Sequence, residues 1–212
     1  KEALKDSGII KPKFIPVCEP TIGEKELEYV TDAVKSGWVS SAGKYITKFE
    51  EGFAAYCNQK HGIACSNGTT ALHLAVEALG IGKGDEVIIP DLTFVATANV
   101  VKYCGASPVF IDCDYDALCL DVEKLKLFLE TECIQKNDGY TYNRTSNRRI
   151  KAIMPVHIFG HPVDMDVLLD LCQLYNIDII EDATESLGSE YKGKKTGSFG
   201  KLGCLSFNGN KI

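Results

Sequence analysis

Short apolar runs rich in β-branched residues alternate with amphipathic helical segments through most of this chain. The candidate strands cover residues 63–65, 87–89, 109–111, 152–156 and 177–180. Between the candidate strands, apolar residues recur at helical spacing. In one predicted helix they form a face of Leu72, Ala75, Val76 and Leu79, and in a later one a face of Val167, Leu168, Leu171 and Leu174. Strands that alternate with helices are typical of a mostly parallel sheet covered by helices. The sequence therefore predicts an α/β fold with both apolar faces in its core.

Two further helices are predicted before the first strand. Thr21 and Glu24 have the spacing of a capping box, so the first helix should begin there and run to about Gly37. A second helix should follow it. The apolar residues at helical spacing are Leu27, Val30 and Val34 in the first helix and Ile46, Phe49 and Phe53 in the second.

The domain organisation is simple. Residues 133–149 interrupt the alternation with a polar, basic, turn-rich stretch, which we interpret as a surface insertion. No internal repeat and no Gly/Ser/Pro-rich linker divides the chain. We expect an N-terminal arm, residues 1–22, and one large domain, residues 23–212. The sequence stops directly after an apolar strand without a closing helix, so we expect this domain to be cut short.

Composition excludes several classes of protein. Lys plus Arg number 23 and Asp plus Glu 29, a formal charge of −6, which argues against a nucleic-acid-binding face. The sequence contains no run of eighteen apolar residues, so it predicts no membrane-spanning helix. The first residues lack the apolar core of a secretory signal. The nine cysteines are scattered without a C-x-x-C pair, so we expect reduced thiols, a cytoplasmic protein, and neither disulfides nor a metal site.

A glycine-containing turn leads from the first candidate strand into a helix. Gly68 allows close approach, and Thr69 and Thr70 add hydroxyls at a helix N-terminus, where free amides and the helix dipole attract anions. The same residues also suit a simple helix cap. The turn matches neither G-x-G-x-x-G nor the P-loop, which disfavours a dinucleotide or nucleoside triphosphate site.

Two later residues are candidates for chemistry. Asp182 ends a buried-type strand, and ligands of parallel sheets bind at that end of the strands, although an acid there can also merely cap a turn. Lys211 follows the apolar strand near the end of the chain, where a single lysine is normally a solvated surface residue.

The order of these features resembles the fold-type I enzymes that use pyridoxal 5′-phosphate. More specifically, the chain is similar to the sugar-nucleotide aminotransferases of the DegT/DnrJ/StrS family. The resemblance extends from Ile15 to Lys211 and is carried by the blocks SGWVSSAGKYITKFE, NGTTALHLAVEALGIGKGDEVIIP, TFVATANVVKYCGA, PVHIFGHPVDMD, EDATESLGSEYKGKKTGSFG and SFNGNK.

The resemblance implies a role for each candidate. Lys211 would form the internal aldimine with the cofactor and then move the proton, and Asp182 would pair with the pyridinium nitrogen. The 5′-phosphate would be held by the amides of Gly68, Thr69 and Thr70 and by the hydroxyl of Ser206, and Phe94 would stack on the pyridine ring. Glu185 lies where the family often has Gln or His beside the cofactor's 3-oxygen, and it would need a proton or a bridging water to bond there. We interpret His157 and His161 as structural.

The implied activity is transfer of an amino group from glutamate to C4 of a nucleotide-linked 4-keto-6-deoxy sugar. The blocks look most like the branch related to legionaminic acid and bacillosamine synthesis, whose substrate is a UDP-2-acetamido-4-keto-2,6-dideoxyhexose. A GDP-perosamine-type enzyme is the alternative. A sugar dehydratase is disfavoured because Lys211 is present, and a catalytically silent sugar-nucleotide-binding or regulatory protein on the same fold stays open. The family further implies a homodimer and a small C-terminal domain beyond this sequence.

Overall fold

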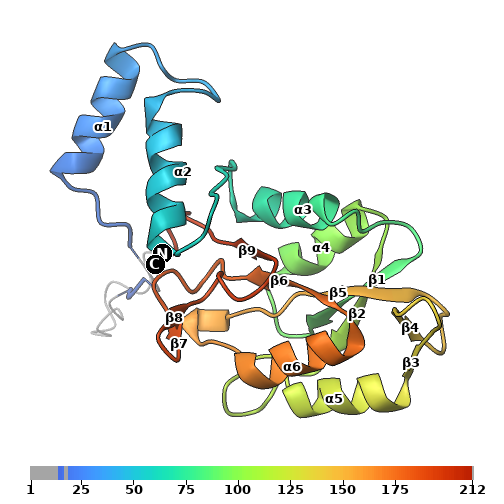
Figure 1. Cartoon of the computed structure of the whole chain (residues 1–212). Coiled ribbons are helices and arrows are strands. Elements are labelled where there is room, and N and C mark those ends of the chain that lie inside the picture. The colour runs from blue at the N-terminus through green and yellow to red at the C-terminus, as the bar shows by residue number, and fades with distance from the viewer. Residues whose placement is uncertain (1–13, 17–18, 212) are drawn as a thin grey trace, which may run out of the picture.

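The computed structural model describes residues 14–16 and 19–211 (Figure 1). Most of the predicted arm, residues 1–22, lies outside them, so the domain boundary stays a prediction. The helices are α1 (Glu24–Lys35), α2 (Lys44–Tyr56), α3 (Gly68–Ala78), α4 (Val95–Tyr103), α5 (Val122–Thr131), the 3-10 helix η1 (Ile158–Gly160) and α6 (Met165–Tyr175). The strands are β1 (Asp85–Pro90), β2 (Ser107–Ile111), β3 (Cys133–Gln135), β4 (Thr141–Asn143), β5 (Arg149–Ile153), β6 (Asp178–Asp182), β7 (Glu190–Tyr191), β8 (Lys194–Lys195) and β9 (Leu202–Cys204).

A seven-stranded sheet forms the centre of the described chain. Strands β2, β1, β5, β6 and β9 lie side by side in that order, and each neighbouring pair is parallel. The antiparallel hairpin β3–β4 joins the sheet through β5. The predicted α/β fold with a mostly parallel sheet is confirmed.

Helices cover both faces of this sheet, as Figure 1 shows, with α3 and α4 on one side and α5 and α6 on the other. Successive side chains of a strand point to opposite faces, so a strand in the middle of the sheet can contribute to both cores. In β1, Ile88 packs with the α5–α6 core, whereas Val87 and Ile89 pack with the α3–α4 core. In β6, Ile179 and Ile180 divide in the same way. This alternation explains why these strands read as continuous apolar runs.

Several local predictions are wrong. Residues 63–65 form no strand, because the Ala64 N–H donates to Glu50 Oε1 at 2.8 Å instead of to a neighbouring strand. Residues 133–149 are more than a surface insertion, since their two short strands extend the sheet. The first helix is capped at Gly23, whose N–H donates to Glu26 Oε2 at 2.8 Å, and not at Thr21. Leu174 is exposed, because it lies on the outer side of α6.

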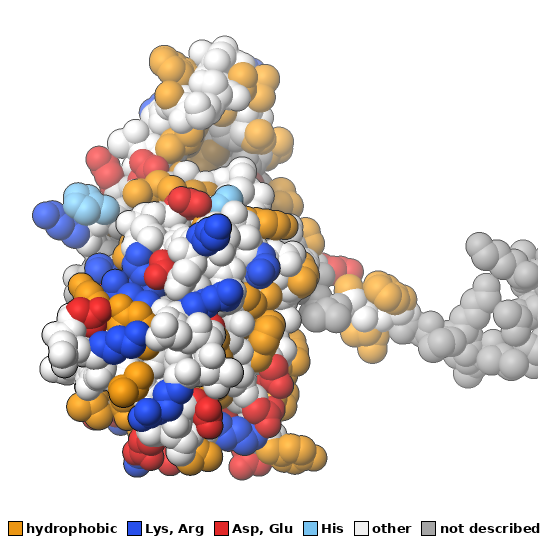
Figure 2. Space-filling view, turned by 90° about the vertical axis from the view of Figure 1, so that its right-hand side faces the viewer, with side chains coloured by type: hydrophobic (Ala, Val, Ile, Leu, Met, Phe, Trp, Pro, Cys, Tyr) orange, Lys and Arg blue, Asp and Glu red, His pale blue; other side chains and the backbone are white. Residues whose placement is uncertain are grey.

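Three further observations concern membrane-spanning helices, cysteines and the distribution of surface charge. No helix of the described residues has both the length and the apolar character needed to cross a membrane. The cysteines that the structure describes are all free. On the face seen in Figure 2, basic, acidic and apolar side chains lie next to one another.

Candidate active site

Gly68 brings the start of α3 against the ends of two strands. A Cβ at this position would lie 3.0 Å from the Ser206 Cβ, which follows β9, and 3.0 Å from the Thr184 Cγ2, which follows β6. Such separations are closer than ordinary contacts, so a side chain would push the three segments apart. Gly68 therefore allows the helix N-terminus, Ser206 and the end of β6 to meet at the carboxyl edge of the sheet.

The first turn of α3 combines a cap with free donors. Asn67 is the N-cap, and its Oδ1 accepts the Thr70 N–H at 3.0 Å. The Thr70 hydroxyl donates to the Asn67 carbonyl at 2.8 Å. Since the cap occupies the Thr70 amide, the amides of Gly68 and Thr69 are the ones left to bind an anion.

Asp182 is a buried carboxylate held by hydroxyl groups. Its Oδ2 accepts the Thr97 hydroxyl at 2.7 Å, and its Oδ1 accepts the Thr184 hydroxyl at 2.7 Å. Burial raises the pKa of Asp182, although the hydrogen bonds from Thr184 and Thr97 oppose the shift. A buried acid of this kind, with neutral donors around it, calls for a positive partner.

No sequence motif marks Thr97 or Thr184 as a functional residue. Thr97 lies one turn after Phe94 in α4 and also contacts the Thr93 hydroxyl at 2.7 Å. A threonine in the first turn of a helix is an ordinary cap residue, so only the fold shows that its hydroxyl reaches Asp182.

Lys211 approaches the same edge of the sheet and pairs with Glu185. Its Nζ lies 2.8 Å from Glu185 Oε1 and 5.9 Å from the centre of the Phe94 ring. Burial raises the pKa of Glu185, but the hydrogen bond from Lys211, the Phe159 N–H and the Lys211 charge outweigh it, and the net shift is downward. Glu185 is thus ionised at neutral pH.

The Phe159 backbone is strained at this contact. Its φ is 52° and its ψ is 24°, in the left-handed region that aromatic residues rarely adopt. The conformation directs its N–H to Glu185 Oε2 at 3.1 Å. Strain of this kind persists where surrounding structure imposes it, often at functional sites.

A family model described as the DegT/DnrJ/EryC1/StrS aminotransferase family matches residues 20–212. The chain belongs to this family. It is 46% identical over 198 residues to a GDP-perosamine synthase of Caulobacter vibrioides, a match that covers 93% of this chain and 49% of that protein. It is 37% identical to a UDP-4-amino-4-deoxy-L-arabinose–oxoglutarate aminotransferase of Shewanella sediminis, covering 91% of this chain and 45% of the relative.

The fold agrees with this family assignment. The aminotransferase from Psychrobacter cryohalolentis superimposes with a TM-score of 0.80 at 34% identity, covering 93% of this chain and 46% of that one. The chain spans about half the length of the curated relatives it matches.

The cofactor of the family is pyridoxal 5′-phosphate, and the residues described above fit it. The two free amides at the start of α3 and the Ser206 hydroxyl, which Gly68 allows to lie beside them, suit a phosphate. Asp182 is a buried acid without a cation bonded to it among the described residues, which suits a protonated ring nitrogen. Phe94 is 67% exposed and can offer its ring to a planar ligand.

The two histidines differ in environment. His157 is fully buried, and its Nδ1 accepts the Val163 N–H at 3.2 Å, so its proton lies on Nε2, which donates to Glu181 Oε2 at 3.0 Å. His161 is exposed, and its carbonyl accepts the Cys119 thiol. The contacts of His157 support its interpretation as a structural residue, whereas the interpretation of His161 stays a prediction.

Glu181 ties the site's last segment to the sheet. Besides His157, its carboxylate accepts three backbone N–H groups, from Gly197 at 2.7 Å, Phe199 at 2.5 Å and Gly200 at 2.6 Å. These residues lead into β9 and on to Ser206 and Lys211, so the buried pair behind the site sets the path of that segment.

Proposed function

We propose that this chain is the cofactor-binding part of an aminotransferase that moves an amino group to C4 of a nucleotide-linked 4-keto-6-deoxy sugar. The observation that carries the proposal is Lys211 at the same sheet edge as the buried Asp182 and the α3 N-terminus, in a member of this family. Glutamate is the proposed donor, which agrees with the name of the oxoglutarate-dependent relative.

Each residue has a distinct task in this proposal. Bound pyridoxal phosphate supplies an electron sink that makes the substrate's C–H bond acidic. Asp182 keeps the ring nitrogen protonated, and Thr97 and Thr184 fix the direction of its carboxylate. The Lys211 amine would hold the cofactor, and its Nζ would take and return the proton at the reacting carbon. Gly68, Thr69 and Ser206 bind the phosphate.

Glu185 is proposed to act on Lys211. Its ionised carboxylate would repel a phenolate oxygen unless a water or a proton lies between them. Its contact with the Lys211 Nζ, at 2.8 Å, instead suits a group that would hold the ammonium in place after Lys211 has taken the proton. Lys211 can then return to the reacting carbon from a defined position.

The nucleotide is the finer part of the proposal. Three relatives that are 44% to 46% identical carry the name GDP-perosamine synthase, which favours a GDP-linked keto sugar. The motif blocks resemble the branch that acts on the UDP-2-acetamido sugar, which is the second candidate. A pocket built for an acetamido group would reject a hydroxyl analogue by about 1–3 kcal/mol for each unpaired partner.

One experiment tests both the proposed amino transfer and the proposed nucleotide sugar. The full-length protein is given nitrogen-15-labelled glutamate and either keto sugar, and the product is analysed by NMR and by kcat/KM. We expect labelled nitrogen at C4 and a higher kcat/KM for the GDP sugar. A preference for the UDP-acetamido sugar would reverse the order of the two substrates and leave the chemistry intact. A deoxygenated product without the label would show a dehydratase, and no product with either sugar would favour the silent binding protein.

We also propose, from the family resemblance, that the protein acts as a homodimer in the cytoplasm. The free cysteines of the described residues are compatible with a reducing compartment. Sedimentation of the full-length protein measures the assembly.

A further inference from the structure

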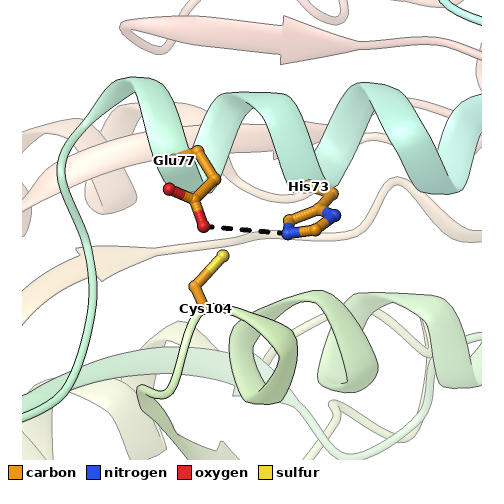
Figure 3. A group of neighbouring side chains, drawn as sticks. All are labelled: His73, Glu77 and Cys104. Carbon is orange, nitrogen blue, oxygen red and sulfur yellow. Dashed lines mark ion pairs between the residues drawn. The ribbon is translucent and has the colours of Figure 1, made fainter.

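A second group of chemically reactive side chains lies away from the candidate active site, between α3 and α4. It consists of His73 and Glu77 on α3 and Cys104 at the end of α4 (Figure 3). Their potential ligand atoms all lie within 4.8 Å of one another. None of the roles proposed above uses them.

The fold brings these residues together in a defined way. His73 and Glu77 are four residues apart, so both project from one face of α3. The His73 Nε2 lies 3.8 Å from Glu77 Oε1, the contact drawn in Figure 3. Cys104 is the C-cap of α4, and its Sγ lies within 4.8 Å of the potential ligand atoms of His73 and Glu77. No linear spacing links Cys104 to the other two residues, because it comes from a second helix that meets α3 only in the fold.

The donor atoms match one class of ligand. Imidazole nitrogen, carboxylate oxygen and thiolate sulfur together suit zinc, which binds them at about 2.0–2.3 Å in a tetrahedral arrangement. Ligand atoms of such a site are roughly 3.3–3.6 Å apart by that geometry. The observed His73–Glu77 separation of 3.8 Å is close to this range.

The position also favours a cation. Glu77 lies in the last turn of α3 and Cys104 caps the C-terminus of α4, so both residues lie near helix ends that carry partial negative charge. Glu77 is exposed and His73 half-buried, which leaves a path for an ion from solvent. Cys104 is half-buried, so its sulfur is shielded on one side.

We propose that His73, Glu77 and Cys104 bind a zinc ion, with a water as fourth ligand, and that the ion links α3 to α4. On binding, the Cys104 thiol gives its proton to solvent, the Sγ–zinc bond forms, and Glu77 turns from the thiol to the metal. The two helices begin at Gly68 and Val95, beside the candidate cofactor site, so the ion would fix their relative position from the opposite end.

The thiol needs the metal to ionise. Burial, the hydrogen bond to Glu77 and the Glu77 charge raise the pKa of Cys104 to about 12. Without zinc, Cys104 is therefore a neutral thiol at neutral pH. A bound dication reverses this balance, as it does for coordinating thiols in general.

The proposal is tested by metal titration of the full-length protein, first stripped of metal with a chelator. We expect one equivalent of zinc at this site with a dissociation constant below about 1 μM. Cobalt should replace it and give a thiolate-to-cobalt charge-transfer band. His73→Ala, Glu77→Gln and Cys104→Ser should each weaken binding, the first and last by more than roughly 100-fold, because even partners outside the ligand shell are worth 10–100-fold.

A matched control is available in the same molecule. Asp91, Asp112 and Cys113 form the other group of potential ligands among the described residues. Cys113→Ser should leave the cobalt band unchanged. Loss of the band in Cys113→Ser but not in Cys104→Ser, or unchanged zinc affinity in folded His73→Ala and Cys104→Ser proteins, would overturn the proposal. Circular dichroism of each metal-free variant checks its folding. None of these measurements depends on the proposed aminotransferase activity.

Discussion

The helices of this chain share one sequence pattern but differ in what they bury. Helix α3 buries Leu72, Ala75 and Val76 against the sheet, whereas α1 buries no residue and α2 buries only Ala54. In Figure 1, α1 and α2 project from the sheet and its covering helices. Apolar spacing thus predicts a helix and its inward face, but burial depends on what packs behind that face.

Exposed contacts join α1 to its neighbour. Asp32 accepts hydrogen bonds from Lys44 and Tyr45, which lower the pKa of its carboxyl, the Lys44 bond first. The rings of Tyr29 and Tyr45 are 5.3 Å apart. Exposed ion pairs add little stability because water and salt screen them. The sheet and its helices therefore hold the fold and the site, and α1 and α2 add mainly apolar surface.

The largest difference between the sheet region and the projecting helices α1 and α2 is expected when one lysine in each region is replaced by arginine. Lys211→Arg keeps a cation for Glu185, but a guanidinium does not deprotonate and cannot form the bond to the cofactor. We expect turnover to fall by roughly 10³-fold or more, as when a covalent nucleophile is removed. Lys48→Arg on α2 is the matched control and should change turnover little. Equal losses in both variants would place chemistry in the projecting helices as well.

A smaller loss of turnover is expected when Asp182 is replaced, with Asp32 as the matched control. Asp182→Asn removes the charge that keeps the ring nitrogen protonated, and we expect kcat to fall roughly 10²-fold, as when one key electrostatic group is lost. Asp32→Asn on α1 should leave kcat nearly unchanged. Normal turnover with a normal cofactor spectrum in Asp182→Asn would mean that this acid only caps a turn.

The same variant separates chemistry from stability. Folding raises the pKa of Asp182, so the carboxylate lowers the stability of the cofactor-free protein as pH rises through that pKa. Asp182→Asn removes this cost. Its cofactor-free form should therefore be at least as stable as the parent at neutral pH, measured by denaturant unfolding.

The sequence predicts features that depend on neighbouring residues, but not contacts between residues that are far apart in the chain. The β-branched runs predicted β1, β2 and β6, and in β1 and β6 burial on both faces leaves a continuous apolar pattern. The contacts of Thr97 with Asp182 and of Glu185 with Lys211 join positions far apart in the chain, so no local pattern marks them. The absent strand at 63–65 shows the converse, a suitable local pattern without a neighbour to pair with.

The smallest effects should come from two valines, one in each region. Val76 is fully buried in α3, and Val30 in α1 is 57% exposed. Val76→Ala removes buried methyl groups and leaves a cavity, so we expect a loss of about 2 kcal/mol in the free energy of unfolding. Val30→Ala removes the same atoms from a largely wet surface and raises helix propensity, so its effect should stay within about 0.5 kcal/mol. Denaturant unfolding of both variants, at equal protein concentration, measures the difference. A loss of about 2 kcal/mol for Val30→Ala would show that its side chain is covered in solution, and the contrast between the two regions would then disappear.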